Sequence, residues 1–261
     1  MGKHSKYFYK FKKTWRQLIL NKYFSVIKYS LKYYLKISPL IKNDKFYFFL
    51  KILKGFNFIE FQKNPNNEKE FFDKKYKFKY DDWFSHNINI WKNYLTKLKE
   101  IRYLEIGSFE GRSAVFMGEL DNVKEITSVD TFTGSDELGK IDFDIVYKNC
   151  SENLDELKIP NNLVKDTSHN FFINNNKKFN VIYIDGSHFY EDVKKDFINS
   201  MNCLEEDGIL ICDDFYWFFY EKIEQNPSGA ILECYENFKK NLDILFLNHQ
   251  IIFKKKKELK K

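Results

Sequence analysis

The sequence predicts an α/β fold in which helices cover both faces of a mostly parallel sheet. From about residue 100 onward, short apolar runs alternate with segments of helical periodicity, a pattern typical of parallel sheets built from strand–helix units. Further along, two more apolar runs flank Asn248-His249. They predict a closing hairpin, and therefore one antiparallel strand in the sheet.

Seven strands and six helical segments are expected. The strands are Arg102–Ile106, Glu125–Val129, Asn162–Val164, Val181–Ile184, Ile209–Cys212, Ile244–Leu247 and Gln250–Lys254. The helical segments are Trp83–Lys99, Arg112–Leu120, Phe143–Leu157, Ser168–Asn175, Tyr190–Leu204 and Ser228–Asn241. The first of these helical segments leads into the first strand, and each of the other five stands between two strands.

We divide the chain into three parts. Residues 1–80 are expected to form a helical extension with a break at Ser38-Pro39, because the residue before a proline disfavours helix. Residues 81–254 are expected to form the α/β domain, and residues 255–261 a basic tail. The clearest linker is Asn64-Pro65-Asn66-Asn67.

Charge is uneven along the chain. Residues 1–60 contain fourteen basic residues and two acidic ones, a net charge of +12, whereas the whole chain carries +6. A basic, aromatic-rich segment is typical of contact with a membrane surface or a polyanion. The alternative is a helical cap that covers the active site or forms a contact between copies of the chain.

Several features predict a cytoplasmic location, with peripheral membrane contact through residues 1–60. The cysteines are Cys150, Cys203, Cys212 and Cys234. None forms a C-x-x-C pair, so reduced structural thiols are expected. No secretory signal is recognisable, and the longest apolar run, Phe46–Leu50, is too short to span a bilayer.

The first strand leads into a glycine-containing turn. Within Tyr103–Gly111 (YLEIGSFEG), the apolar run carries Glu105, breaks at Gly107, and reaches Gly111 just before a predicted helix. Such a turn is where polar groups of a cofactor meet backbone N–H groups. The G-x-x-x-G spacing, in place of G-x-G-x-x-G, favours a cofactor without a pyrophosphate. Glu105 is expected to position the turn and approach a cationic or amino group of the cofactor, the alternative being a solvated strand end.

Two further candidates lie at the ends of the second and third strands. Asp130 follows Gly107 by 23 positions, close to the interval at which an acid binds ribose hydroxyls; its alternative role is to cap the following turn. After the third strand, Asp166 or Thr167 either caps the next helix or contacts the adenine edge of a nucleoside.

Carboxylates also gather after the fourth and fifth strands. Asp185 and His188 follow the fourth, and Asp213 and Asp214 follow the fifth. Oxygen ligands of this kind suit Mg²⁺, Mn²⁺ or Ca²⁺, and such an ion acidifies a bound hydroxyl. His188 is a candidate base. The alternative is that the two strand-end aspartates cap turns while His188 lies on the surface.

The segment before the first strand adds aromatic residues and a histidine. Trp83 and Phe84 are expected to pack rather than to contact a substrate, and the role of His86 is left open.

Four motifs together resemble the class I S-adenosylmethionine-dependent methyltransferases, and most closely the subgroup of macrocin-type sugar O-methyltransferases. The motifs are YLEIGSFEGRS (Tyr103–Ser113), DTFTGS (Asp130–Ser135), IYIDGSH (Ile182–His188) and GILICDDF (Gly208–Phe215). The resemblance covers about residues 81–254. It implies a Rossmann-like three-layer sandwich with strand order 3-2-1-4-5-7-6 and an antiparallel seventh strand. Phe109 departs from the family by replacing the usual middle glycine, and Asp166 stands where a glycine is often found.

The resemblance also implies a cofactor and its ligands. S-adenosylmethionine would lie across the ends of strands 1 and 2. The matching positions are Glu105, Gly107, Ser108 and Gly111 on the methionine side, Asp130 at the ribose, and Thr167 and Ser168 near the adenine. In metal-dependent relatives the positions of Asp185, Asp213 and Asp214 hold Mg²⁺, and a histidine placed like His188 serves as base beside Asp185.

These features predict an enzyme that methylates a hydroxyl of a small-molecule or sugar-type acceptor with help from a divalent ion. Homo-oligomerisation is left open. Nucleic-acid methylation is disfavoured, because the fourth strand ends in Asp-Gly-Ser-His rather than Asn/Asp-Pro-Pro-Tyr/Phe and no Pro-Cys nucleophile is present. Protein methylation, and a membrane-peripheral module with an inactive fold, are the remaining alternatives.

Overall fold

A computed structural model describes residues 3–61, 66–134 and 140–257, with side chains for residues 20–60, 70–134 and 140–257. Ser135 of the second motif, Asn64 and Pro65 of the expected linker, and residues 258–261 of the basic tail lie outside the described residues. The chain forms two compact units. The helical unit comprises Met1–Gln62 with Phe246–Asn248, and the sheet unit comprises Lys63–Leu245 with His249–Lys261.

The sheet has seven strands, as predicted. They are β1 (Ile101–Ile106), β2 (Val123–Asp130), β3 (Asn161–Lys165), β4 (Phe179–Ile184), β5 (Leu204–Cys212), β6 (Leu242–Leu247) and β7 (Ile251–Lys255). Their order is β3-β2-β1-β4-β5-β7-β6. The strands β1 to β5 pair in parallel and β7 pairs antiparallel to β5. Both the predicted strand order and the reversed seventh strand are therefore confirmed.

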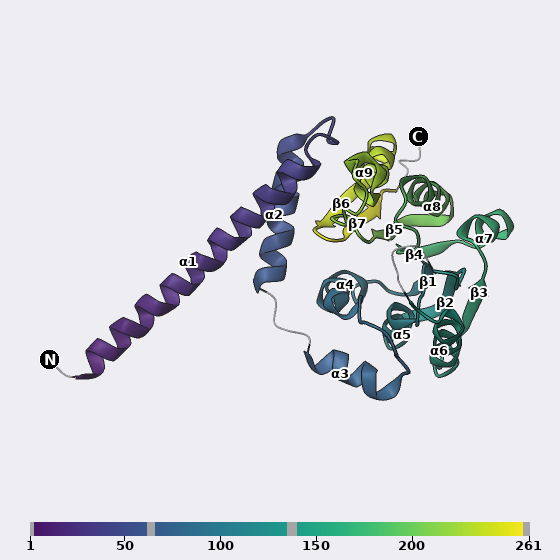
Figure 1. Cartoon of the computed structure of the whole chain (residues 1–261), viewed down its shortest axis with the longest axis horizontal. Helices are drawn as coiled ribbons and strands as arrows, with labels where there is room; N and C mark the ends of the chain where they lie inside the picture. Colours follow the sequence, from purple (N-terminus) through teal and green to yellow (C-terminus); the bar gives the residue numbers. More distant parts are fainter. Residues whose placement is uncertain (1–2, 62–65, 135–139, 258–261) are drawn as a thin grey trace. The chain divides into compact units, whose positions relative to one another are not determined.

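Helices alternate with the strands and cover both faces of the sheet (Figure 1). They are α3 (Asn66–Lys75), α4 (Ile88–Leu95), α5 (Arg112–Gly118), α6 (Phe143–Asp155), α7 (Ser168–Asn174), α8 (Tyr190–Cys203) and α9 (Pro227–Phe238), with short 3-10 turns η1 (Ser85–Asn87) and η3 (Ile223–Gln225). Local sequence explains where two of these helices begin. Asp142 caps α6 by accepting from the N–H groups of Asp144 and Ile145, and α9 begins at Pro227, whose missing N–H costs nothing there.

The core of the sheet unit is rich in aromatic side chains. Trp91, Tyr103, Tyr183 and Phe253 are almost completely buried. Trp91 packs edge-on against Tyr183, with ring centres 4.8 Å apart. Because two of these aromatic residues are tyrosines in the central strands, their hydroxyl groups need buried acceptors, and the candidate site supplies them.

The helical unit contains two long helices, α1 (Lys3–Ile37) and α2 (Lys45–Phe61). The predicted break is confirmed, since α1 ends immediately before Ser38-Pro39. Aromatic contacts join the helices: Tyr33 stacks on Phe56 with ring centres 5.5 Å apart. In the part of the chain that the structure describes, no helix has both the length and the apolar character needed to cross a membrane.

Candidate functional site

The candidate residues lie along one edge of the sheet. Asp130 ends β2, whereas Gly107, Asp185 and Asp213 directly follow β1, β4 and β5. The segment after β3 joins the same row, because the Asp166 N–H donates to the Asp130 carbonyl oxygen over 3.1 Å. The carboxyl ends of parallel strands form the ligand-binding edge of open α/β sheets.

Three residues of the glycine turn adopt a left-handed backbone conformation. Gly107, Phe109 and Gly111 have φ values of 87°, 48° and 79°. A side chain at Gly107 would place its Cβ 2.0 Å from the backbone oxygen of Asp185. The Asp185 N–H in turn donates to the Ile106 carbonyl over 2.8 Å. Gly107 is therefore required by the close approach of the segments that follow β1 and β4.

Asp130 holds the glycine turn in place. Its Oδ2 accepts hydrogen bonds from the N–H groups of Ser108 and Phe109, at 2.8 and 2.9 Å. Its Oδ1 accepts one from the Phe132 N–H at 2.8 Å. A carboxylate oxygen can accept two hydrogen bonds, so among the described residues Oδ1 keeps one acceptor position. The half-buried carboxylate thus fits a ribose hydroxyl while it also supports the turn.

Glu105 lies inside the unit and is completely buried. Its carboxyl group accepts from the hydroxyls of Tyr103 (3.0 Å), Ser113 (2.7 Å) and Ser128 (2.8 Å). Burial raises its pKa to about 7, an effect that these hydroxyl donors partly oppose. Glu105 therefore braces β1, β2 and α5 behind the turn. Its predicted approach to the cofactor stays a prediction.

The residues after β3 make local hydrogen bonds. Thr167 caps α7, since its hydroxyl oxygen accepts from the Asn170 N–H at 3.2 Å. The Asp166 carboxylate accepts from the Thr167 N–H at 2.7 Å. Burial raises the pKa of the Asp196 carboxyl group in α8 to about 7, an effect that the Ser168 hydroxyl partly opposes. These hydrogen bonds show Thr167 in its alternative role as a helix cap. Contact of Thr167 or Ser168 with adenine stays a prediction.

A buried polar network lies under the ends of β4 and β5. The Tyr183 hydroxyl contacts both the Asp185 and Asp213 carboxyl groups. It can donate to one of them only, which favours a proton on the other. Burial and neighbouring carboxylates raise the pKa of both groups, that of Asp213 to about 7. Gln250 completes the network, because it donates to Asp213 over 2.7 Å and accepts from the Trp91 indole over 2.9 Å.

Among the residues that the structure describes, one group of three side chains could hold a metal ion. Asp185, His188 and Asp214 each offer a ligand atom, and these atoms lie within 4.8 Å of one another. The His188 Nε2 is 2.8 Å from Asp214 Oδ2. Two carboxylates and an imidazole are a donor set that suits Mg²⁺ or Mn²⁺, so the residues fit a divalent ion.

This group differs from the one predicted from the sequence, which joined Asp213 to Asp185 and Asp214. In the structure, the Oδ2 of Asp213 lies against Tyr183 and Gln250, and its Oδ1 accepts from the Asp214 N–H at 2.8 Å. Asp213 is therefore hydrogen-bonded to groups of the protein, and His188 is the third member of the group with Asp185 and Asp214. Adjacent residues were assigned together from the sequence, but their side chains diverge after the strand.

Glu110, which the sequence analysis did not single out, connects the segment before the sheet to the glycine turn. Its buried carboxylate accepts from the N–H groups of Lys79 and Tyr80, at 2.8 and 2.9 Å, and from the Asn149 amide at 2.7 Å. These bonds place residues 77–80 in the sheet unit, whereas the sequence placed them in the extension. The only hint of this role in the sequence was the position of an acidic residue directly before Gly111.

Aromatic side chains also meet at the glycine turn. Trp83 lies over Phe109, with ring centres 4.8 Å apart, and Tyr80 lies 5.9 Å from the same ring. Phe84 is buried against Trp91, as expected of a packing residue. His86 lies beside His249, with ring centres 4.7 Å apart.

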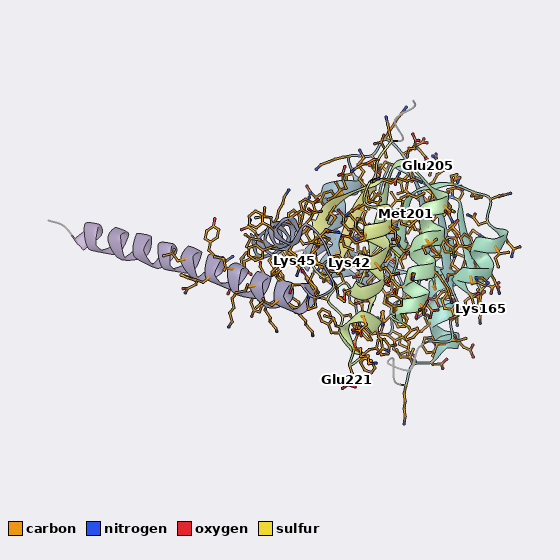
Figure 2. The ribbon with its side chains drawn as sticks, turned by 90° about the horizontal axis from the view of Figure 1, so that it is seen from above. Lys42, Lys45, Lys165, Met201, Glu205 and Glu221 are labelled. Atoms are coloured by element: carbon orange, nitrogen blue, oxygen red, sulfur yellow. The ribbon has the colours of Figure 1, made fainter. Side chains whose placement is uncertain are left out.

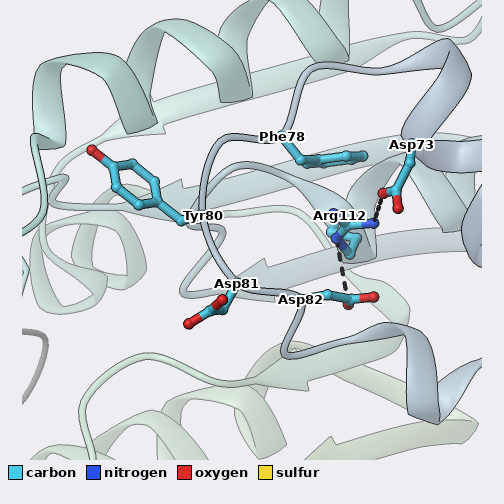
Figure 3. A pocket seen from close by; sticks show the side chains of 6 residues that line it. All are labelled: Asp73, Phe78, Tyr80, Asp81, Asp82 and Arg112. Atoms are coloured by element: carbon cyan, nitrogen blue, oxygen red, sulfur yellow. Dashed lines mark hydrogen bonds and ion pairs between the residues drawn. The ribbon is translucent and has the colours of Figure 1, made fainter.

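A pocket of about 350 Å³ opens beside α5 (Figure 3). Its lining residues are Asp73, Phe78, Tyr80, Asp81, Asp82 and Arg112. Arg112 donates to Asp73 over 2.6 Å, lies 3.4 Å from Asp82, and stacks on the Phe78 ring at 3.7 Å. Because its charge is met by two carboxylates, Arg112 acts here as a clamp between α3, the 78–82 segment and α5.

Comparison with known proteins supports a methyltransferase. Residues 104–215 match a family model described as a methyltransferase domain, which spans β1 to the residues just after β5. The fold is a methyltransferase fold. No curated protein sequence matches the chain.

Solved structures resemble the chain at low sequence identity. MycE methyltransferase from the mycinamycin biosynthetic pathway, in complex with Mg and SAH, has a TM-score of 0.51 at 15% identity, covering 76% of this chain and 55% of that one. An O-methyltransferase from Bacillus cereus, in complex with SAH, has a TM-score of 0.50 at 13% identity, covering 76% and 93%. An rRNA methylase from Streptococcus thermophilus has a TM-score of 0.47 at 13% identity, covering 65% and 96%.

Proposed function

We propose that the sheet unit transfers a methyl group from S-adenosylmethionine to a hydroxyl oxygen of a small-molecule or sugar-type acceptor, with help from a divalent ion. One observation carries the proposal. Gly107 lies so close to the Asp185 backbone that a Cβ would stand 2.0 Å from its oxygen. The glycine turn and the group Asp185, His188 and Asp214 are therefore neighbours, so a donor at the turn lies next to an acceptor held by that group.

On the donor side, the protein's task is to bind and align. S-adenosylmethionine supplies an electrophilic methyl group on a sulfonium. Asp130 keeps the turn in shape through the amides of Ser108 and Phe109 and offers Oδ1 to a ribose hydroxyl. Alignment of donor and acceptor is the main contribution that such an enzyme makes to a methyl transfer.

On the acceptor side, the protein must hold a hydroxyl and remove its proton. A divalent ion bound by Asp185 and Asp214 would orient the acceptor oxygen and make it more acidic. The Asp214 carboxylate, 2.8 Å from His188 Nε2, orients the imidazole and stabilises its protonated form. His188 thus has two possible roles, third ligand or base, and a ring nitrogen that ligates an ion cannot also accept the proton.

The similar structures add support for this chemistry. The Bacillus cereus protein is an O-methyltransferase in complex with SAH, and MycE is a methyltransferase in complex with Mg and SAH. Both resemblances have low identity, so the acceptor of this chain is proposed only by chemical class.

Calorimetric titration with S-adenosylmethionine tests the donor half of the proposal. We expect the full-length protein to bind it, and Asp130→Ala to lower the affinity at least about tenfold, because the turn loses its support and the ribose its acceptor. Asp121→Ala, at an exposed carboxylate before β2, is the matched control. Wild-type affinity in Asp130→Ala would remove the assigned donor site.

The acceptor half is tested by methyl transfer from labelled S-adenosylmethionine to a panel of hydroxylated small molecules and sugars. Activity is expected to fall on addition of EDTA and to return with Mg²⁺ or Mn²⁺. Turnover that is indifferent to EDTA and added metal would show that the group Asp185, His188 and Asp214 works without an ion.

A further inference from the structure

We propose that the helical unit docks on an anionic lipid bilayer through one face of α1. Among the side chains of α1 that the structure describes, those of residues 20–37, five aliphatic or phenylalanine side chains are exposed: Leu20 (52%), Phe24 (69%), Ile27 (51%), Leu31 (46%) and Leu35 (59%). We call these five residues the apolar stripe. Apolar side chains that are exposed together in this way mark an interaction surface.

The stripe is continuous along one side of the helix. Its members follow one another at intervals of four, three, four and four residues, which keeps them on one face at 3.6 residues per turn. The stripe extends over 15 residue steps, or about 22 Å of helix. A helix with such a face lies in the plane of a bilayer interface and buries the face among the acyl chains.

The stripe is not the side that packs within the helical unit. Val26 and Ser30 are buried, and by helical geometry they are turned about 100° to 160° around α1 from Phe24 and Leu31. The Tyr33 ring stacks on Phe56 of α2. The packing of α1 on α2 is therefore satisfied by other residues, which leaves the stripe facing outward.

Lysines flank the stripe on one side. Lys28, Lys32 and Lys36 each follow a stripe residue by one position, which rotates them by about 100° from it. Lys42 and Lys45 come next, in the turn and at the start of α2 (Figure 2). Lysine side chains beside an apolar face reach the headgroup level of a membrane.

Charge decides between an anionic bilayer and a second copy of the chain. Residues 20–37 contain four lysines and no acidic residue. Two copies joined stripe to stripe would bring like-charged flanks together with no carboxylate on α1 between them. An anionic bilayer instead complements the lysines, and it attracts the net charge of +12 on residues 1–60. The observations therefore favour the lipid surface.

Vesicle sedimentation of the full-length protein tests the proposal. We expect it to pellet with vesicles of phosphatidylcholine containing 30% phosphatidylserine, and at least tenfold less with phosphatidylcholine alone. The triple variant Phe24→Ser, Ile27→Ser, Leu31→Ser should reduce binding to the anionic vesicles at least tenfold. Its control is Ile173→Ser, which changes an exposed apolar residue of α7 and should bind like the wild type.

A second variant keeps the test independent of any folding defect. Lys28→Gln, Lys32→Gln, Lys36→Gln leaves the apolar stripe intact and should also weaken binding at least tenfold, as should 0.5 M NaCl. Circular dichroism checks that both variants keep their helices.

Several results would overturn the proposal. They are equal pelleting of wild type and either variant, equal binding to neutral and anionic vesicles, or a dimer that the serine variant dissociates while no vesicles are bound. None of these measurements depends on methyl transfer, so the inference stands or fails separately from the proposed function.

Discussion

The backbone of Asp185 occupies the space that a side chain at Gly107 would need, since an added Cβ would lie 2.0 Å from the Asp185 oxygen. This contact joins the turn after β1 to the turn after β4. It places the proposed donor side and the proposed acceptor side of the candidate site in direct contact. A change on one side is therefore expected to affect the other.

Gly107→Ala should destabilise the sheet unit by about 3 kcal/mol or more, because it adds left-handed strain at φ 87° and a backbone clash. Urea unfolding measures the loss. Gly186→Ala is the control at the neighbouring position, where the new Cβ would meet the Ile106 side chain at 3.4 Å. It should change stability by less than about 1 kcal/mol. Equal effects of the two substitutions would contradict the interlocking of the two turns.

Glu110→Ala should cost about 2–3 kcal/mol, because it removes the acceptor of the Lys79 and Tyr80 amides in a buried position. It should also expose the 77–85 segment to limited proteolysis. The exposed Glu221 provides a control, since Glu221→Ala removes an acid without a buried role. A Glu110→Ala protein as stable as this control would mean that the segment is held by other contacts.

Glu105 predicts a pH dependence of stability. Its pKa rises from 4.5 to about 7 in the folded protein through burial, so the folded state favours the protonated form. The resulting stabilisation is complete below about pH 4.5 and is lost as the pH rises through 7. Glu105→Gln lacks this titration.

Between pH 5 and pH 8 the unfolding free energy of Glu105→Gln, relative to wild type, should therefore rise by about 2.5 kcal/mol. Unfolding curves at both pH values measure this difference, and other buried acids such as Asp196 cancel from it. A difference that stays constant would falsify the raised pKa.

The metal group predicts selective loss of ion binding. Asp214→Asn should weaken Mn²⁺ binding, followed by electron paramagnetic resonance, at least about tenfold, because it removes one carboxylate ligand from the group with Asp185 and His188. Glu191→Gln, at an exposed acid on α8, should bind Mn²⁺ like the wild type. If the wild type bound no Mn²⁺, the three side chains would not form a metal site, and proton transfer would be their remaining role.

His188→Ala then separates the two roles of the imidazole. If His188 is a ligand, Mn²⁺ affinity falls together with turnover. If it is the base, Mn²⁺ affinity is retained, and turnover recovers as the pH is raised and the acceptor loses its proton without help. The same electron paramagnetic resonance titration and a pH–rate profile distinguish these outcomes.

The succession of strands and helices along the chain was accessible because each element carries its own periodicity. The order of the strands in the sheet followed from the resemblance of the motifs to a known fold. Four of the six residues of Ile101–Ile106 are apolar or aromatic, and all except Arg102 are buried, as expected of a central strand covered on both faces. The break of the front helix before Ser38-Pro39 followed from local sterics alone. Such features depend on residues close together in the chain.

Pairings between distant residues needed the tertiary structure. Tyr183 lies two positions before Asp185, so strand alternation places both on one face, but nothing local reveals that the hydroxyl also meets Asp213. Gln250 reaches Asp213 across 37 positions, and Glu110 accepts from Lys79 across 31. These partners depend on how strands and loops meet in space.

The sequence by itself thus determined the order of strands and helices, the acids and glycines at the strand ends, and the basic character of the front segment. The tertiary structure decided that Glu105 is buried among hydroxyls, that Asp213 is held by Tyr183 and Gln250, and that His188 joins Asp185 and Asp214. The physical reason is that periodicity specifies which side of a strand or helix a residue occupies. The environment of a carboxylate, in contrast, is set by neighbours that only the packed sheet brings within hydrogen-bonding distance.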